Sequence, residues 1–252
     1  MSDLTIATAT TADRLSGLRL PDPETGVDHV ITVQGGVPDT LPDALDRADI
    51  ALIADPHRGL SHNRNCGLAA AKGTLVLFND DDIALDMAGI TQMRGLFAAD
   101  PTLALALGWR TGEVPKRGRR TGSFALTRFT AGHASAPGLM VRRTAVLGAG
   151  VTFDPAFGVG APAPIGEDYI FVTDLLRAGL KGRGVPIETG AHPHPSTGDD
   201  WHNPDLMRAR RAMLARVFGP VHPLVRAAYT LRHRHRFSTA AAALRFALGQ
   251  DA

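Results

Sequence analysis

Residues 59–82 read GLSHNRNCGLAAAKGTLVLFNDDD, and this stretch decides the fold of the chain. It predicts a helix that is capped by Ser61, is rich in alanine and ends at Gly73. Residues 74–78 are apolar without alternation, which is typical of a strand buried on both faces. An asparagine and three aspartates follow directly. Ligands of open α/β sheets bind outside the carboxyl ends of the strands, so we expect these acids at a binding site.

The three successive aspartates need a counter-charge or a change in protonation. Two carboxylates about 4 Å apart repel by roughly 4 kcal/mol at a near-surface dielectric. On an extended backbone the side chains of Asp80 and Asp82 point the same way, and that of Asp81 points the other way. Asp80 and Asp82 are therefore a candidate site for Mg²⁺ or Mn²⁺. An acidic turn whose aspartates cap their own backbone is the alternative.

The composition is that of an ordinary globular protein, with 252 residues, 44% of them apolar and 21% charged. This length suits one α/β domain with a small appendage. The formal net charge of +2 gives no reason to expect a nucleic-acid partner. The single cysteine, Cys66, and the lack of a signal-peptide pattern at the start predict a cytoplasmic location. No segment has the apolar length needed to span a bilayer.

The order of elements predicts an α/β domain over residues 1–218 and a basic helical tail over 219–252. Strands are expected over 4–10, 27–33, 50–54, 103–109, 139–142 and 184–187, and helices over 12–18, 42–48, 87–98, 205–218 and 224–248. Such alternation is typical of βαβ units and a parallel sheet. The basic, amphipathic helices of the tail can lie on an anionic membrane or pack on the body, and the sequence leaves both open.

Two motifs resemble those of glycosyltransferase family 2. In this family a G-x-S-x-x-R-N helix precedes a strand that ends in Asp-x-Asp, and the matching residues are Gly59, Ser61, Arg64, Asn65, Gly67, Gly73, Asp80, Asp81 and Asp82. Residues 153–160, FDPAFGVG, resemble the F-D-x-x-F-G-x-G run of bacterial members. The resemblance implies a GT-A fold, that of the nucleotide-diphospho-sugar transferases, with a mostly parallel central sheet, flanking helices and a helical C-terminal tail.

The resemblance also implies roles for individual residues. In the family an acid pair at a helix start supplies the catalytic base, usually as its second member, which here is Asp168 after Glu167. Glu167 can equally be a dipole partner of that helix. The donor nucleotide sugar is expected at Thr8, Gln34, Asp55, Gly59, Ser61, Arg64, Asp80 and Asp81. The divalent cation, Mn²⁺ or Mg²⁺, is expected at Asp80, Asp82 and His192.

Four features leave alternatives open. Gln34 stands where the family usually has an acid for the nucleotide base, and Asp55 can either contribute there or cap a turn. His192 and His194 lie among prolines, and we place the metal ligand at His192, although a surface loop is the alternative. The basic segment 113–128 is either a solvated loop or a lid that attracts a phosphate-bearing substrate. Trp109 can stack on a sugar or belong to the core.

The sequence thus predicts a metal-dependent inverting glycosyltransferase that moves a sugar from a nucleotide-diphosphate donor to an acceptor hydroxyl. The expected acceptor is a saccharide or lipid-linked saccharide, in bacterial polysaccharide or glycoconjugate synthesis. The alternatives are a nucleotidyltransferase on the same type of sheet and a binding module that holds nucleotide sugars without turnover.

Overall fold

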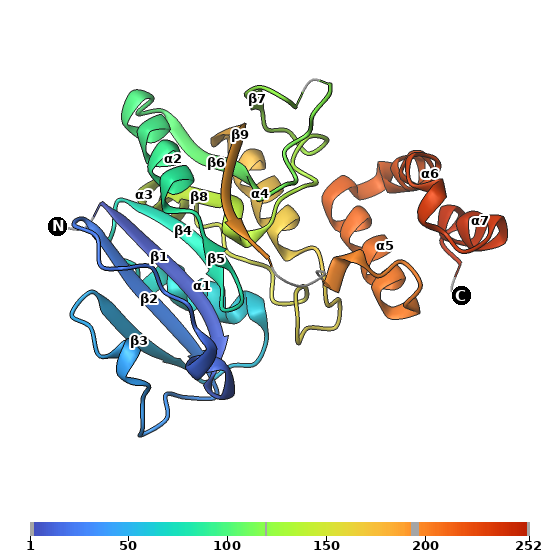
Figure 1. The fold of residues 1–252 in the computed structure, drawn as a ribbon. Coiled ribbons are helices and arrows are strands. Elements are labelled where there is room, and N and C mark those ends of the chain that lie inside the picture. Colours follow the sequence, from blue (N-terminus) through green and yellow to red (C-terminus); the bar gives the residue numbers. More distant parts are fainter. Residues whose placement is uncertain (1–2, 119, 193–196, 251–252) are drawn as a thin grey trace.

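The computed structural model describes residues 3–118, 120–192 and 197–250. Its strands are β1 (Leu4–Thr11), β2 (Val27–Gln34), β3 (Ile50–Asp55), β4 (Leu75–Asp80), β5 (Ala84–Leu85), β6 (Leu103–Arg110), β7 (Phe124–Ala125), β8 (Leu139–Arg142) and β9 (Lys181–Ala191). Its α-helices are α1 (Leu60–Ala70), α2 (Met87–Ala99), α3 (Arg143–Ala149), α4 (Glu167–Arg177), α5 (Pro204–Phe218), α6 (His222–Arg232) and α7 (Ala240–Leu248). Figure 1 shows α5, α6 and α7 grouped beside the sheet-containing body.

Within these residues the strands form one sheet in the order β3-β2-β1-β4-β8-β6-β9-β5, and β7 pairs with β9. Strands β1 to β4 run parallel, as does the pair β6 and β9. Strand β8 runs antiparallel to both of its neighbours, β4 and β6. The predicted α/β fold with a mostly parallel central sheet is confirmed.

The register of the parallel strands brings their polar carboxyl ends level. Ala9 on β1 lies opposite Asp80 on β4, and Thr11 on β1 lies opposite Gln34 on β2. Gln34 in turn lies opposite Asp55 on β3. Polar side chains that are far apart in the sequence therefore meet along one edge of the sheet, and this edge is where a ligand is expected.

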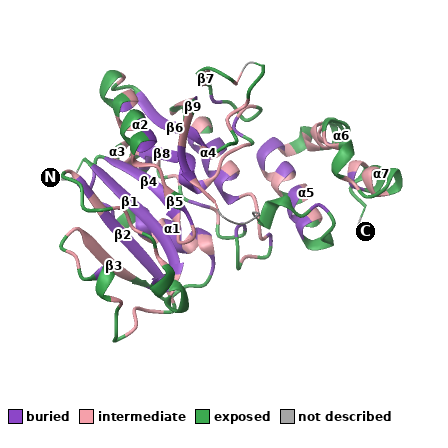
Figure 2. Cartoon of the chain, viewed as in Figure 1, coloured by how far each residue is buried: buried purple, intermediate pink, exposed green. Residues whose placement is uncertain are grey.

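Strand β4 is buried on both faces, as its unbroken apolar run predicts. Val76 and Phe78 pack into one core cluster with α1 and α4, while Leu75 and Leu77 pack into another with α2. All of β1, β4 and β6 except their ends is buried (Figure 2). Each large side chain buried in this way contributes about 1.5–3 kcal/mol, so the acids that follow β4 are anchored on a rigid element.

Two details of the segment 59–82 differ from the sequence prediction. Gly59, not Ser61, is the N-cap of α1, and its φ of +114° lies in a region that favours glycine. Gly73 lies beyond the helix end, and a Cβ there would come within 2.6 Å of the Thr5 amide nitrogen. Gly73 is therefore needed for the close approach of the chain to β1 rather than for ending the helix.

Two predicted helices are shorter than expected. Within 42–48 only a 3₁₀ turn forms, Asp43–Leu45, and Leu45 is the buried residue in it. A single apolar side chain does not provide the face that a longer helix needs. The tail segment 224–248 is split into α6 and α7, and α7 starts anew where the Thr239 hydroxyl accepts a hydrogen bond from the amide of Ala242. Among the described residues, no helix combines the length and the hydropathy that a membrane span requires.

Candidate active site

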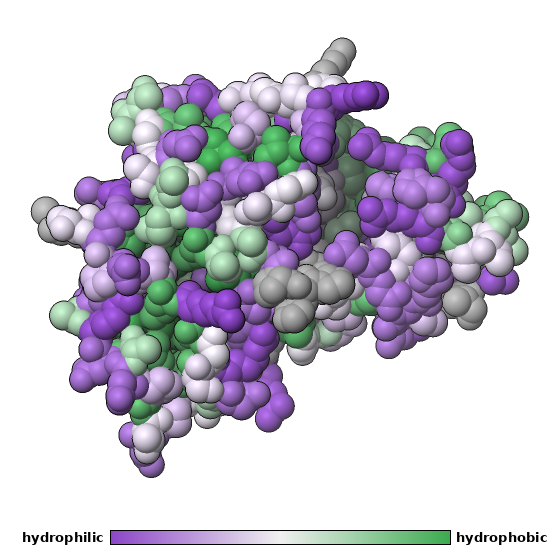
Figure 3. Space-filling view, in the orientation of Figure 1, coloured by the Kyte–Doolittle hydropathy of each residue, from purple (hydrophilic) through white to green (hydrophobic). Residues whose placement is uncertain are grey.

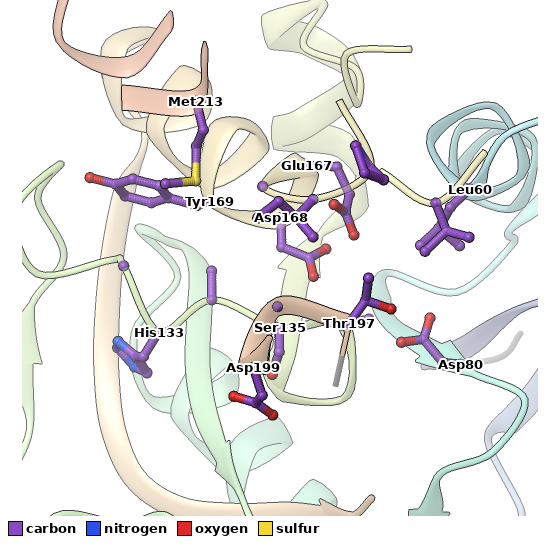
Figure 4. Close-up of a pocket in the computed structure, with 18 of the residues that line it drawn as sticks. Leu60, Asp80, His133, Ser135, Glu167, Asp168, Tyr169, Thr197, Asp199 and Met213 are labelled. Carbon is purple, nitrogen blue, oxygen red and sulfur yellow. The ribbon is translucent and has the colours of Figure 1, made fainter. Parts of the chain in front are cut away.

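A cavity of about 1220 Å³ opens at the carboxyl edge of the sheet and extends to the C-terminal helices. Its lining at the sheet edge includes Thr10, Thr11, Arg14, Gln34, Arg64, Asp80, Asp81, Asp82 and His192, and α4 adds Glu167, Asp168 and Tyr169. Figure 4 shows the carboxylates of Asp80, Glu167 and Asp168 facing a common space. The cavity thus brings together the acids that follow β4 and the acids that open α4.

One buried arginine joins these two groups of acids. The guanidinium of Arg64, on α1, is only 2% exposed and contacts three carboxylates. Its Nη2 lies 2.7 Å from Asp80 Oδ1, and its Nη1 lies 2.6 Å from Asp168 Oδ1 and 3.1 Å from Glu167 Oε1. A single positive charge does not neutralise three negative ones, so the cluster favours a bound proton or cation.

Asp168 is the member of this cluster whose protonation changes most. Burial, opposed by the guanidinium of Arg64 and helped by the charges of Glu167 and Asp80, raises the pKa of Asp168 to about 7. A group with a pKa near neutrality both accepts and releases protons at physiological pH. Asp168 therefore has the protonation behaviour of a general base, as well as a position in the cavity.

Asp81 is held by two residues that the sequence analysis did not single out. The Thr10 hydroxyl donates to Asp81 Oδ2 over 2.7 Å, and Arg14 Nη2 lies 2.8 Å from Asp81 Oδ1. Burial raises the pKa of Asp81, and these two partners counteract it. Thr10 lies near the end of β1 and Arg14 lies in the turn after it. The pairing of β1 with β4 brings this part of the chain to Asp81. The sequence carries no local signal for that pairing.

Asp82 and His192 lie together, beside Arg14. His192 Nε2 is 3.4 Å from Asp82 Oδ1, and Arg14 Nη2 is 3.5 Å from Asp82 Oδ2. The predicted set of three ligands does not form one group, because Asp80 turns to Arg64. Accordingly, the described part of the chain contains no group of three His, Cys, Asp or Glu side chains placed to hold a metal.

The pair Asp82 and His192 still fits a cation that the donor also binds. Mg²⁺ in proteins is usually held by one or two carboxylates together with substrate phosphates, and not by a complete protein cage. Both side chains are partly exposed to the cavity, at 26% for Asp82 and 16% for His192. An oxygen and an imidazole nitrogen are also a ligand set that Mn²⁺ accepts.

Two residues predicted to bind the donor, Thr8 and Ser61, form hydrogen bonds inside the folded chain. Thr8 is fully buried, and its hydroxyl accepts a hydrogen bond from the Asn79 amide. Ser61 is 1% exposed and donates to the carbonyl of Phe157 over 2.7 Å. Neither Thr8 nor Ser61 lines the cavity. The buried strand and the folding of the FDPAFGVG segment onto α1 account for their positions.

Gln34, Asp55 and Gly59 form a small group at the edge of the cavity. The Gly59 amide donates to Gln34 Oε1 over 3.0 Å, and Gln34 lines the cavity. Asp55 is 2% exposed and accepts a hydrogen bond from the amide of His57, which is the turn-capping alternative noted above. Asp55 and Gly59 lie outside the cavity lining. Of these three predicted donor contacts, Gln34 alone faces the cavity.

The aromatic and histidine predictions have mixed outcomes. Trp109 is 8% exposed and stacks on His133 with ring centroids 4.0 Å apart, so it belongs mainly to the core wall of the cavity. His194 lies outside the described residues. Thr197 lines the cavity, and Figure 4 shows it between Asp168 and Asp80.

The basic segment 113–128 is not only a solvated loop. Its residue Arg120 is half-buried, stacks over Phe124 at 5.6 Å and lines the cavity. The carbonyl of Arg128 accepts a hydrogen bond from the hydroxyl of Tyr169. The segment is thus tied to α4 one residue after Asp168.

One protein-family model matches the part of the chain that contains Arg64 and the acids at the end of β4. The model of the family described as Glycosyl transferase family 2 matches residues 16–149. This match covers more than half of the chain and includes Arg64 and the three aspartates, whereas Glu167, Asp168 and His192 lie beyond it. Comparison with curated proteins gives no match.

Solved structures share the fold at low sequence identity. S. aureus TarS residues 1–349 in complex with UDP-GlcNAc superpose with a TM-score of 0.60 and 13% identity, over 93% of this chain and 73% of that one. The mannosyltransferase PcManGT from Pyrobaculum calidifontis, in complex with GDP-Man and Mn²⁺, superposes with a TM-score of 0.59 and 17% identity, over 99% of this chain and 76% of that one. The GT-A fold inferred from the sequence motifs is confirmed.

Proposed function

The chain belongs to glycosyl transferase family 2, and from this premise we propose that it transfers a sugar from a nucleotide-diphosphate donor to an acceptor hydroxyl with inversion. The observation that carries the proposal is the contact of one buried arginine with Asp80, Glu167 and Asp168 inside a cavity of about 1220 Å³. Through this contact Asp168, the candidate base, and Asp80, at the end of β4, bind the same guanidinium group.

In this mechanism Asp168 takes the proton of the acceptor hydroxyl while the oxygen forms its bond to the anomeric carbon. Inversion follows when the acceptor attacks from the face opposite the departing diphosphate. Arg64 keeps the Asp168 carboxylate oriented over 2.6 Å and keeps part of its population ionised. Glu167 accepts a hydrogen bond from Nη1 of Arg64, the same nitrogen that donates to Asp168. Its role in the proposal is therefore to position Asp168.

Donor binding is assigned to the carboxyl edge of β1, β2 and β4. We propose that Asp82 and His192 hold a divalent cation, with Asp80 facing the donor. Such a cation offsets the charge that develops on the departing diphosphate. Two proteins of the same fold support this part of the proposal, TarS in complex with UDP-GlcNAc and PcManGT in complex with GDP-Man and Mn²⁺. Gln34 and Thr11 line the same end of the cavity and are proposed donor contacts.

A panel of nucleotide sugars tests the proposal directly. A ligand that binds the folded state raises the melting temperature according to its own affinity, so the best donor is expected to give the largest shift. The panel is measured with and without Mn²⁺, and the best donor is then assayed for sugar transfer to saccharide and lipid-linked acceptors. If no donor in the panel shifts the melting temperature, the proposal is wrong.

Replacement of Asp82 by alanine is expected to remove the dependence of donor binding on metal. In the parent protein, donor affinity in Mn²⁺ should exceed that in EDTA by at least about tenfold, equivalent to about 1.4 kcal/mol. The Asp82→Ala protein should bind the donor equally in both buffers, as measured by calorimetry. Asp39→Asn, an exposed acid outside the cavity, is the control and should behave as the parent. Equal binding of the parent in Mn²⁺ and EDTA would exclude the cation site.

We also propose that the tail touches a membrane, which would place the enzyme at the cytoplasmic face where lipid-linked acceptors are used. The tail exposes four leucines by more than half, namely Leu224 (76%), Leu231 (66%), Leu244 (60%) and Leu248 (58%). The two on α6 are seven residues apart and the two on α7 four apart, so each pair lies on one helical face. Exposed leucines beside basic side chains suit the surface of an anionic bilayer.

Flotation with anionic vesicles tests the tail. The double variant Leu224→Ser/Leu231→Ser is expected to lose vesicle binding by about tenfold or more, because each buried leucine contributes about 1.5–3 kcal/mol. Leu147→Ser is the matched control, since Leu147 is 45% exposed but lies on α3 in the body. Vesicle binding that is equal in the parent and the double variant would show that the tail leucines are not the contact.

A further inference from the structure

The cavity has a second end, which is basic and lies away from the acids. It is lined by four arginines and one histidine from the segment 113–128 and from the C-terminal helices, namely Arg120, Arg210, Arg232, His233 and Arg236. We call this set the arginine cluster. Figure 3 shows the surface recessed between the body and the C-terminal helices, with hydrophilic residues on its rim.

The arginines of the cluster are not neutralised by carboxylates. Within the described residues, no carboxylate oxygen lies within 4.0 Å of the guanidinium nitrogens of these four arginines. They contact rings and carbonyls instead. Arg210 lies 4.5 Å over the Trp201 ring, and Arg236 lies 5.4 Å over the same ring. Arg210 Nη1 also donates to the backbone carbonyl of Asp200 over 2.9 Å.

The acids nearest to the cluster are engaged elsewhere. The Asp200 carboxylate accepts hydrogen bonds from the backbone amides of His202 and Asn203. Glu113 lines the cavity but pairs with Arg110 at 3.0 Å. Asp199 also lines the cavity, and Figure 4 shows it beside Ser135. The cluster therefore keeps a net positive charge in a partly enclosed space.

The positive charges of the cluster also act on one another. Burial, followed by the charge of Arg232, lowers the pKa of Arg120. Burial lowers the pKa of Arg210, Tyr229 and the charge of Asp200 oppose this, and the charge of Arg236 adds to the lowering. Burial and then the charges of Arg232 and Arg236 lower the pKa of His233 to about 4. Like charges that face one another cost free energy, and an anion placed between them removes that cost.

We propose that the arginine cluster binds a phosphate or diphosphate group of the acceptor, so that the acceptor substrate is an anionic, phosphate-bearing molecule. The inference rests on the proposed function and specifies its acceptor class. Guanidinium groups match phosphate oxygens in pairs of hydrogen bonds, and four of them offer more donors than a single carboxylate accepts.

The opposite charges at the two ends explain how two anionic substrates share one cavity. The proposed site of the donor diphosphate is the sheet edge, where Asp82 and His192 would hold a cation that offsets its charge, and the proposed site of the acceptor phosphate is the arginine cluster. Figure 4 shows Asp168 between Asp80 on one side and Tyr169 and Met213 on the other. An acceptor anchored by its phosphate would thus present a sugar hydroxyl to the base.

Inorganic pyrophosphate, titrated by calorimetry in EDTA, is the probe for the cluster. EDTA removes the cation, so the acids at the sheet edge repel the probe. Arg232→Gln/Arg236→Gln is expected to bind pyrophosphate at least about tenfold more weakly than the parent, equivalent to about 1.4 kcal/mol. Arg234→Gln is the matched control, because Arg234 is exposed in the same turn as Arg236 but does not line the cavity.

The outcomes separate this inference from the proposed function. Equal pyrophosphate affinity in the parent and the double glutamine variant overturns it, as does an equal loss in Arg234→Gln. Arg232→Lys/Arg236→Lys, which keeps the charge, should retain most of the affinity, and matching melting temperatures show that the variants are folded. Asp82→Ala should bind pyrophosphate in EDTA as the parent does. If the parent protein binds pyrophosphate but binds no nucleotide sugar, the proposed function alone is refuted.

Two further probes identify the source of the phosphate. One is glycerol 3-phosphate in solution, and the other is phosphatidylcholine vesicles that contain phosphatidic acid. Flotation is measured in the Leu224→Ser/Leu231→Ser background, which removes the proposed tail contact. Flotation that is lost with Arg232→Gln/Arg236→Gln and kept with Arg234→Gln then assigns a lipid phosphate. Binding of glycerol 3-phosphate without flotation assigns a phosphate within a soluble saccharide. Failure of both probes to bind the parent overturns the inference.

Discussion

Asp168→Asn is expected to reduce the rate of sugar transfer by about 10²–10⁴-fold, the usual contribution of a positioned acid–base group. Asparagine keeps the size of the side chain and its hydrogen bond to Arg64 but accepts no proton. Donor and metal should bind nearly as in the parent, since Asp168 faces the acceptor side of the cavity. Single-turnover transfer and donor calorimetry measure the two effects separately.

The pH dependence of the parent gives an independent check on this base. Because the pKa of Asp168 is raised to about 7, the rate should fall as the pH is lowered through this value and the carboxylate takes up a proton. This acidic limb should disappear in Asp168→Asn. Glu167→Gln is the matched control, and its loss of rate should be smaller. If Glu167→Gln were the inactive variant and Asp168→Asn the active one, the base would be Glu167.

Arg64→Met is expected to destabilise the protein by about 3–5 kcal/mol, the usual cost of removing one partner from a buried ion pair. Methionine approximates the length of the arginine stem, so the loss comes mainly from the charge. Three carboxylates, Asp80, Glu167 and Asp168, would face one another without the guanidinium that now lies within 3.1 Å of each. Urea unfolding measures the change in the free energy of unfolding.

The direction of its pH dependence distinguishes this cause from a loss of packing. Without Arg64 the pKa of Asp168, which is already raised to about 7, rises further above its unfolded value because the opposing charge is gone. Protonation of Asp168 then stabilises the folded state, and this stabilisation is lost as the pH rises through the folded-state pKa. The deficit of Arg64→Met should therefore shrink at lower pH. Arg94→Met, which removes a surface pair with Glu24, should cost less than about 1 kcal/mol. A deficit independent of pH would contradict the electrostatic cause.

The sequence predicted the sheet well because its strands carry strong local signals. The run 74–78 is apolar on both faces, and the structure buries both faces of β4. The predicted helix 42–48 was wrong, because a run of helix-compatible residues does not supply the apolar face that packing requires. Gly73 was misread as a helix end, since its real constraint is the nearby backbone of Thr5, a contact between distant segments.

The candidate site was predictable in its acids but not in their partners. The triplet after β4 and the acid pair of α4 stand out as sequence motifs, and the structure brings Asp80 close to Asp168 through Arg64. Thr10 and Arg14 carried no such signal, since only the register of β1 against β4 brings them to the aspartates. The arginine cluster was likewise hidden, because Arg120 precedes the other members by 90 residues or more in the sequence.

The position of Arg64 has a consequence for building chimaeric enzymes from members of this family. Arg64 and Asp80 lie inside the matched segment 16–149, while Glu167 and Asp168 lie after it. A crossover just after residue 149 would keep the arginine from one parent and take its two α4 partners from the other. Such a hybrid keeps the Arg64–Asp80 pair, but it keeps all three carboxylates around Arg64 only when the incoming helix begins with an acid pair at the matching positions. Compatibility of the two halves thus reduces to the charge carried by the first turn of one helix.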